Sequence, residues 1–415
     1  MIRAIAAIAL CLLLAGSLRP VAAPGPVAFT EDEIETILSH GPWPMEWSHD
    51  PTNRVSGKPE AVAFGRQLFF NTRLSANGQV SCATCHRPGH SWTDGRTLGV
   101  ALGEVDRNTP TLANVRLNRW FGWDGATDSL WAHSMRPLLD AREHGLTERQ
   151  VANVIRDNAD LACGYRRAFG AEPPADDELA LVNVAKALAA FQETIASGRT
   201  PFDDFRDAMA AGDAAAMAAY PVAAQRGLKI FAGQGRCSLC HFGPNFSHGE
   251  FHEIGIPVFR KSGGIDWGRY QGVKLLRASR FNRLGGFNDD TDPDSGMSTR
   301  HVELGAQTYE QFKVPSLRNV AVTAPYMHSG HFATLPQVVK HYSEIDPANL
   351  HVAHIYLGDE YSLNEAPPTD DMLRPLKLSA TQIADVVAFL ETLTEKAPSP
   401  PPSAAGPGPC VMQAR

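Results

Sequence analysis

Apolar positions recur with helical spacing in several separate stretches of the chain. Thr30 and Glu33 have the spacing of a capping box, which predicts a helix over residues 31–39. Thr147 is a capping residue ahead of a stripe formed by Val151, Val154 and Ile155. Further helices are expected at residues 61–70, at the Ala-rich stretch 179–197 and after a capping box at Ser379 and Gln382. The pattern therefore predicts an all-α, loop-rich protein.

The pattern occurs twice. Residues 65–69 (GRQLF) resemble residues 227–231 (GLKIF), and residues 190–195 (AFQETI) resemble residues 388–393 (AFLETL). Each half has the order helix, Cys-x-x-Cys-His segment, loops and final amphipathic helix. Such a repeat predicts two similar domains, which we assign to residues 24–205 and 206–396.

The repeated cysteine segments carry the chemistry. They read Cys82-Ala-Thr-Cys85-His86 and Cys237-Ser-Leu-Cys240-His241. Two thiols one helical turn apart can each bond to a vinyl group of one porphyrin, and the following histidine is then a proximal iron ligand. A four-cysteine zinc site is the alternative, but it leaves both histidines unexplained. We therefore expect two cytochrome c-like domains, each with one covalently bound haem c.

Composition and the chain ends suggest an exported protein. Arg3 precedes an apolar stretch at residues 4–15, and residues 21–23 resemble a cleavage site, so residues 1–23 are predicted to be a signal peptide. This favours a periplasmic location and a mature chain without a membrane span. The net charge of -7 argues against nucleic acid as a partner. Residues 397–415 form a Pro-rich tail that is expected to be disordered. Two cysteines, Cys163 and Cys410, lie outside both the Cys-x-x-Cys-His segments and the signal peptide. They either form a disulfide with each other, or Cys163 is a buried free thiol.

The mature chain resembles the bacterial dihaem cytochrome c peroxidase and MauG superfamily. The resemblance rests on the order and spacing of both Cys-x-x-Cys-His segments with the sequences RNTP at 107–110, WDG at 123–125, FKVPSLRNV at 312–320 and APYMHSG at 324–330. It implies that the haem held by His86 reacts with hydrogen peroxide at an open iron face. The haem held by His241 is then six-coordinate and stores or passes an oxidising equivalent.

The resemblance also implies the second ligand of the second haem. Tyr342 stands where the peroxidases of this family have a methionine and where MauG-like members have a tyrosine. A phenolate is a hard anion that stabilises oxidised iron, whereas a thioether stabilises reduced iron. The alternative is that the neighbouring His341 is the ligand and that Tyr342 is a packed aromatic.

Four further residues take roles from the resemblance. Glu143 matches the acid–base carboxylate of the peroxide site, for which a surface carboxylate at a helix end is the alternative. His133 stands at the glutamine position of that site, so its charge near neutral pH is open. Pro137 matches a proline that lines the pocket, and Trp123 matches the tryptophan that relays electrons between the haems.

A calcium ion between the haems is implied as well. Its ligands would be Asn108 and backbone oxygens of Thr323 and Pro325, an oxygen-only set that suits calcium. The chain differs from MauG at the surface tryptophan through which a protein substrate is oxidised, because Gly235 stands at that position. Trp267, Tyr270 and Trp120 are other aromatic residues that could serve as this electron-transfer site. The segment 264–288 looks closer to MauG relatives that modify other proteins, such as the MbnH type.

Three functions are compatible with these residues. The first is peroxide-driven oxidation of a Trp or Tyr of a partner protein, a hypothesis that is based on Tyr342. The second is a periplasmic cytochrome c peroxidase that reduces hydrogen peroxide to water with electrons from a small cytochrome or cupredoxin. The third is an electron carrier without catalysis, which requires two six-coordinate irons.

Overall fold

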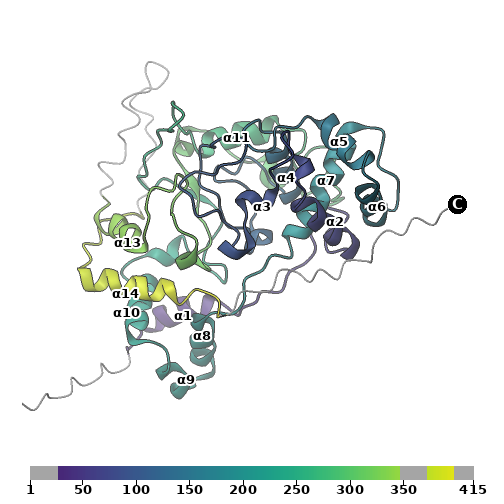
Figure 1. Cartoon of the computed structure of the whole chain (residues 1–415). Helices are drawn as coiled ribbons and strands as arrows, with labels where there is room; N and C mark the ends of the chain where they lie inside the picture. Colours follow the sequence, from purple (N-terminus) through teal and green to yellow (C-terminus); the bar gives the residue numbers. More distant parts are fainter. Residues whose placement is uncertain (1–26, 346–371, 397–415) are drawn as a thin grey trace, which may run out of the picture.

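The structure is a computed structural model that describes residues 27–345 and 372–396. The predicted signal peptide and Pro-rich tail lie outside these residues. The regular secondary structure of the described part is almost entirely helical, with long loops between the helices (Figure 1), which confirms the predicted fold class. The two-residue strands β1 and β2 pair antiparallel, with Phe251 opposite Lys313 and His252 opposite Phe312. None of the described helices is both long and apolar enough to cross a membrane.

The α-helices are α1 (Glu31–Ser39), α2 (Pro59–Phe69), α3 (Cys82–Cys85), α4 (Leu130–Leu139), α5 (Glu148–Arg156), α6 (Ala159–Phe169), α7 (Asp177–Gln192), α8 (Pro201–Ala211), α9 (Ala214–Ala218), α10 (Val222–Ala232), α11 (Arg269–Ala278), α12 (Met297–Arg300), α13 (Leu335–Glu344) and α14 (Ala380–Glu391). The strands are β1 (Phe251–His252) and β2 (Phe312–Lys313). Short 3-10 helices lie at Thr72–Leu74, Pro88–His90, Val115–Leu117, Cys237–Leu239, Ala306–Thr308 and Val320–Val322.

Each half is built on one pair of closely crossing helices. In the first half α2 crosses α7, and in the second α10 crosses α14. A glycine stands at each crossing: a Cβ atom on Gly65 would lie 1.9 Å from the Ala187 carbonyl oxygen, and one on Gly227 would lie 1.9 Å from that of Asp385. Only a residue without a side chain permits this approach, so the glycines of the sequence repeat position the two cores identically.

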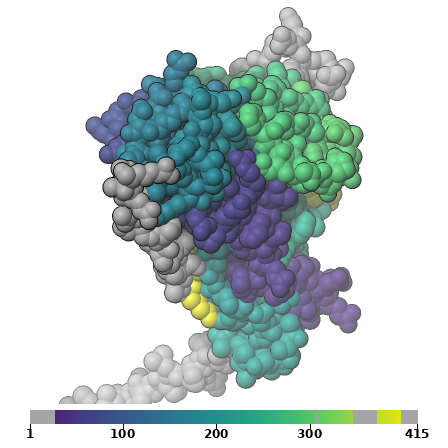
Figure 2. Space-filling view, turned by 90° about the vertical axis from the view of Figure 1, so that its right-hand side faces the viewer, coloured from purple at the N-terminus to yellow at the C-terminus, as the bar shows by residue number. Residues whose placement is uncertain are grey.

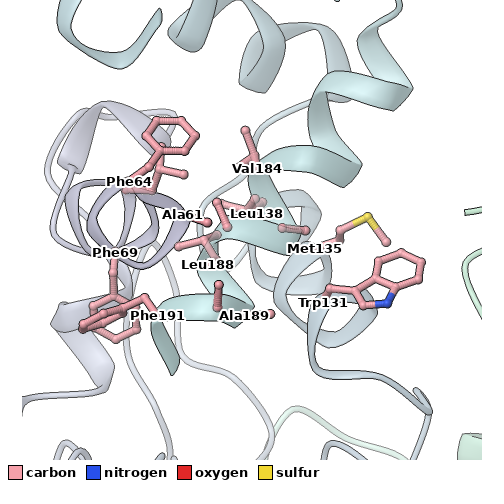
Figure 3. Packing of buried hydrophobic residues seen from close by; sticks show 14 of the residues in the cluster. Ala61, Phe64, Phe69, Trp131, Met135, Leu138, Val184, Leu188, Ala189 and Phe191 are labelled. Atoms are coloured by element: carbon pink, nitrogen blue, oxygen red, sulfur yellow. The ribbon is translucent and has the colours of Figure 1, made fainter. Parts of the chain in front are cut away.

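The two cores are separate clusters of apolar side chains. The first contains Phe64, Phe69 and Phe191. The rings of Phe69 and Phe191 lie 5.2 Å apart, and Figure 3 shows these two rings close together. The second contains Phe231 and Phe389, whose rings lie 4.9 Å apart. Cys82 packs at the edge of the first cluster and Cys237 at the edge of the second. Each core thus supports one Cys-x-x-Cys-His segment.

Most helix ends agree with the predicted caps, including the capping boxes of α1, α5 and α14. The Ala-rich helix is the exception, because α7 ends at Gln192 and not at residue 197. Beyond it the Ile195 carbonyl accepts a hydrogen bond from the Asn114 backbone N–H, and the Asn114 side chain bonds to Ser197. These bonds to a distant loop replace the last helical turn.

Two observations bear on the chain's organisation. Ile37 of α1 and Phe202 and Phe205 of α8 pack in the second core, although they precede residue 206. The domain boundary stays a prediction, and the second core extends across it. Cys163 is half-buried and disulfide-bonded, and its partner lies outside the described residues. The expectation of a buried, unpaired Cys163 was therefore wrong.

The connection between the second Cys-x-x-Cys-His segment and β2 is long. It contributes β1, α11 and α12, and it places the green lobe of Figure 2 beside the helices of the first half. Arg107 fixes this lobe, since its guanidinium lies 2.7 Å from Asp266 and 2.8 Å from Asp124. The connection is therefore bound to the loop that precedes α4.

Candidate dihaem site

Both predicted proximal histidines are oriented in the same way. His86 Nδ1 lies 3.1 Å from the Trp92 carbonyl oxygen, and His241 Nδ1 lies 3.0 Å from that of Phe246. Trp92 and Phe246 both have left-handed backbones, with φ of 62° and 51°. A ring that donates through Nδ1 keeps its Nε2 lone pair for a metal. The loop after each segment therefore sets the tautomer that an iron ligand needs.

Burial favours the uncharged forms of Cys82, Cys237, His86 and His241. Burial raises the pKa of Cys82 and of Cys237 to about 12, and burial lowers the pKa of His241 to about 4. Neutral imidazole is the form that binds metals. Thiols that become thioethers leave no charge behind, so these buried positions suit covalent attachment of haem better than they suit a site of free thiolates.

The first segment opens onto a cavity of about 550 Å³, within the range of cofactor sites. Cys82, Cys85 and His86 line it from the first half, and Pro315, Pro325 and Tyr326 line it from the second. The residues present therefore fit a haem in this position, and the cavity lies where the two halves meet.

The three predicted residues of the peroxide site and the predicted relay tryptophan all line this cavity. They are Trp123, His133, Pro137 and Glu143. Glu143 follows α4 in a turn that starts at Asp140, whose carbonyl accepts the Glu143 backbone N–H. Burial raises the pKa of Glu143 to about 7, and the nearby Asp140 adds to the rise. A carboxyl group with this pKa can both accept and donate a proton near neutral pH.

His133 has the opposite character. Burial lowers its pKa to about 3, and the cations Arg136 and Lys313 contribute to the decrease. Its Nδ1 lies 3.2 Å from Thr127 Oγ1. The imidazole is therefore neutral near pH 7, which answers the question that the sequence left open. His133 can offer a hydrogen bond in this cavity, but it does not carry a charge there.

The repeat shows why the two sites differ. The pairs Asn114 and Asn319, Ser129 and Thr334, and Pro137 and Tyr342 are each 205 residues apart. Both asparagines have left-handed backbones, Ser129 and Thr334 are the N-caps of α4 and α13, and Pro137 and Tyr342 are the eighth residues of these helices. Pro137 thus occupies in the first half the position of Tyr342 in the second. A proline ring offers no ligand atom, whereas a phenol does.

The surroundings of Tyr342 favour it over His341 as the residue that faces the second haem segment. Burial raises the pKa of Tyr342 above its usual range, and the sulfurs of Cys240 and Cys237 are near enough to add to the rise. His341 Nε2 lies instead 2.7 Å from the Ile254 carbonyl oxygen. The His341 ring is therefore engaged on another side of α13.

Trp123 and the predicted calcium ligands lie close to the boundary between the halves. The Trp123 Nε1–H donates to the Asn108 carbonyl oxygen at 2.9 Å, and the Asn108 backbone N–H donates to the His328 carbonyl. Asn108, Thr323 and Pro325 all line the same cavity as Trp123. The Asn108 amide nitrogen donates to Arg96, which leaves its Oδ1 for another partner. Calcium at this place stays a prediction.

Sequence reasoning missed one cavity residue. Lys313 extends into the cavity from β2, donates to the Trp120 carbonyl oxygen at 3.1 Å and has a pKa that burial lowers to about 8. It follows Phe312 within the sequence FKVPSLRNV, so the motif contained it. Its role could not be read from the chain, because only the fold brings β2 next to α4.

The described residues contain one other group of three potential metal ligands: Cys240, His248 and His252. The Glu250 backbone N–H donates to His248 Nδ1, so a neutral His248 carries its proton on Nε2. That Nε2 lies 2.8 Å from His252 Nε2 and donates to it. The two imidazoles are thus close enough to share a hydrogen bond, and the third group, Cys240, belongs to the second haem segment.

Comparisons with known proteins agree with this geometry. The profile of the family described as "Di-haem cytochrome c peroxidase" matches residues 59–211. Methylamine utilization protein MauG of Methylorubrum extorquens is 32% identical over 366 residues, which cover 88% of this chain and 86% of the relative. The chain belongs to the dihaem cytochrome c peroxidase and MauG family. It is thus a dihaem oxidoreductase with two c-type haems.

The relatives in this family include both MauG proteins and cytochrome c peroxidases. Cytochrome-c peroxidase IdrP1 of Denitromonas iodatirespirans is 31% identical over 354 residues, with 82% of each chain covered. The crystal structure of a MauG-like protein associated with microbial copper homeostasis has a TM-score of 0.59 and 26% identity, and it covers 88% of this chain and 99% of that one. The dihaem peroxidase BthA of Burkholderia thailandensis shares the fold, with a TM-score of 0.63 and 23% identity over 84% of this chain and 90% of that one.

Proposed function

We propose that this protein uses hydrogen peroxide to oxidise an aromatic residue, Trp or Tyr, of a partner protein in the periplasm. The observation that carries the proposal is the pair Pro137 and Tyr342. Equivalent positions of α4 and α13 hold a residue that cannot bind iron in one half and a phenol in the other. We assign Tyr342 as the second ligand of the second haem.

The chemistry of a phenolate ligand supports oxidation of a partner protein over reduction of peroxide by a small cytochrome. Bound haem supplies redox chemistry, and an anionic oxygen ligand favours its oxidised states over its reduced state. A site of this kind retains oxidising power and accepts electrons poorly from a small cytochrome. A methionine at position 342 would favour the alternative, a peroxidase fed by such a cytochrome.

The residues around the first cavity have separate tasks. Glu143 moves the proton, because a carboxyl group with a pKa near 7 can take it from one peroxide oxygen and return it to the other. The neutral His133 orients peroxide by a hydrogen bond. Pro137 keeps the cavity free of a protein ligand, and Trp123 connects the two halves.

Spectroscopy of the holoprotein tests the proposal. One equivalent of peroxide is expected to change the absorbance of both haems, and reduced horse cytochrome c is expected to be consumed slowly. Tyr342→Met is expected to remove the long-lived oxidised state and to accelerate cytochrome oxidation. Rapid turnover of cytochrome c by the wild-type protein, or an unchanged oxidised state in Tyr342→Met, would overturn the proposal.

A further inference from the structure

The tryptophans of this chain fall into two groups by charge. Four have a cation over the indole face, which makes it harder to remove an electron from the ring because the resulting cation radical lies beside a positive charge. These are Trp43 (Arg318 at 3.5 Å), Trp47 (Arg116 at 4.3 Å), Trp120 (Arg269 at 4.5 Å and Arg119 at 5.2 Å) and Trp131 (Lys186 at 5.1 Å). Among the described cations, none lies over Trp92, Trp123 or Trp267.

Two of these three belong to the haem sites. Trp92 accepts the hydrogen bond of His86, and its ring packs 6.0 Å from Phe69. Trp123 lines the first cavity. Trp267 is the remaining member, and it lies half-buried in the lobe that follows the second haem segment.

Trp267 is joined to two tyrosines. The Trp267 and Tyr309 ring centroids lie 5.4 Å apart at 68°, and Tyr309 stacks on Tyr270 at 4.0 Å and 18°. Tyr309 is buried, whereas Trp267 and Tyr270 are half-buried. Lys274 lies over Tyr270 at 5.4 Å, which leaves Trp267 and Tyr309 as the members that are easier to oxidise.

A continuous chain of bonds connects this group to Trp123. Trp123 donates to the carbonyl of Asn108, and the preceding residue is Arg107. The Arg107 Nε and Nη2 atoms lie 2.8 and 2.7 Å from the carboxylate of Asp266, which precedes Trp267. Trp123 and Ile265 also pack against the same small cluster of Val258 and Phe312, and Phe312 lies three residues after Tyr309.

We propose that Trp267, backed by Tyr309, is the point at which electrons enter this protein from its oxidised partner residue. The inference rests on the proposed function and names its exit site, meaning the place at which oxidising equivalents leave the protein as electrons enter it. Hydrogen peroxide takes up two electrons and two protons and becomes two waters. Each electron is drawn through Trp123 from Trp267, whose indole proton passes to water. A Trp or Tyr side chain of the partner then returns one electron and one proton to Trp267.

Position 235 explains why another exit is needed. A Cβ atom on Gly235 would lie 2.6 Å from the Ile230 carbonyl oxygen, so this backbone does not accept a side chain. A tryptophan at the place used by MauG is therefore incompatible with the local fold. The Trp267 group supplies oxidisable rings in a different segment of the chain.

The experiment uses the holoprotein and hydrogen peroxide without any partner. Peptide mass spectrometry is expected to find oxygen adducts at Trp267 and Tyr309. Trp47 is the matched control, because its side chain is 37% exposed but lies under Arg116. Indiscriminate surface oxidation would modify Trp47 at least as strongly as Trp267, and that result would overturn the inference.

The lifetime of the peroxide-oxidised absorbance provides an independent measurement. Trp267→Phe is expected to lengthen it about tenfold or more, since the internal electron source is lost, whereas Trp47→Phe is expected to leave it unchanged. An unchanged lifetime in Trp267→Phe would refute the exit site while leaving the proposed function intact. If peroxide produced no oxidised state in the wild-type protein, the proposed function itself would fail, and the inference with it.

Discussion

Glu143→Gln is expected to change stability and activity in opposite directions. Burial raises the pKa of Glu143 from its ordinary value of 4.5 to about 7. A carboxyl group whose pKa is raised in the folded state favours folding most below pH 4.5, and that contribution is lost as the pH rises through 7. Over this interval the ionised carboxylate costs at most about 3 kcal/mol, at about 1.4 kcal/mol for each tenfold change in proton affinity.

Glutamine has no charge to bury, so the variant should be more stable than the wild-type protein at alkaline pH. The expected gain is about 3 kcal/mol at pH 8 and less than about 1 kcal/mol at pH 5. Guanidinium unfolding of the holoprotein at the two pH values measures this difference. The same gain at both pH values would show that the Glu143 pKa is not raised.

The reaction with peroxide should respond in the other direction. With a pKa of about 7, roughly 1% of Glu143 is ionised at pH 5 and roughly 90% at pH 8. If the carboxylate takes the peroxide proton, the wild-type rate rises steeply across this range. Stopped-flow absorbance should show a slow and flat profile for Glu143→Gln. His133 cannot supply this pH dependence, because a pKa of about 3 makes it a weak base whose protonation state does not change between pH 5 and pH 8.

Glu193→Gln is the matched control. Burial raises the pKa of Glu193 to about 7 as well, but this side chain bonds to Ser56 and does not line the haem cavity. It should show a comparable pH-dependent gain in stability with an unchanged rate profile. A steep wild-type profile that persisted in Glu143→Gln would assign proton transfer to another group.

Three further outcomes are expected. Gly227→Ala should destabilise the second core by about 2 kcal/mol or more, because its Cβ would meet the Asp385 carbonyl, whereas Gly286→Ala has open space and should melt like the wild-type protein. Arg107→Leu should cost about 3 kcal/mol in chemical unfolding at pH 7, since the buried Asp124 and Asp266 lose their shortest ion pairs and keep only the longer ones to Arg136 and Arg260. That cost should shrink in acid, because Arg107 helps to hold the Asp266 pKa down to about 2 and the carboxyls of the variant take up protons more readily. Tyr342→Phe should alter the ferric EPR signal of one haem only, and two altered signals would contradict the ligand assignment.

Local chemistry made much of this protein predictable from its sequence. The Cys-x-x-Cys-His segments need only adjacent residues, and the caps at Thr30, Thr147 and Ser379 form hydrogen bonds within one turn. The repeated glycines at helix crossings were visible as sequence identity between the halves. Structure that depends on hydrogen bonds between residues close in sequence can therefore be predicted from the sequence.

Contacts between distant segments could not be predicted. The early end of α7 depends on Asn114, which lies 83 residues before Ser197. Arg107 pairs with Asp266 across 159 residues, and Lys313 reaches the cavity because its backbone N–H donates to the distant Trp123 carbonyl oxygen. The same limit applies to α1, whose apolar stripe gave no sign that it would cover the second core.

The shared eighth position of α4 and α13 has a consequence for engineering. Because the flanking caps and turns are alike in both halves, exchanging Pro137 and Tyr342 swaps one ring for another on equivalent backbones. If Tyr342 is the iron ligand that we propose, this single position decides whether each half offers a protein ligand on the second face of its haem. A Pro137→Tyr variant is then expected to close the first site, and a Tyr342→Pro variant to open the second.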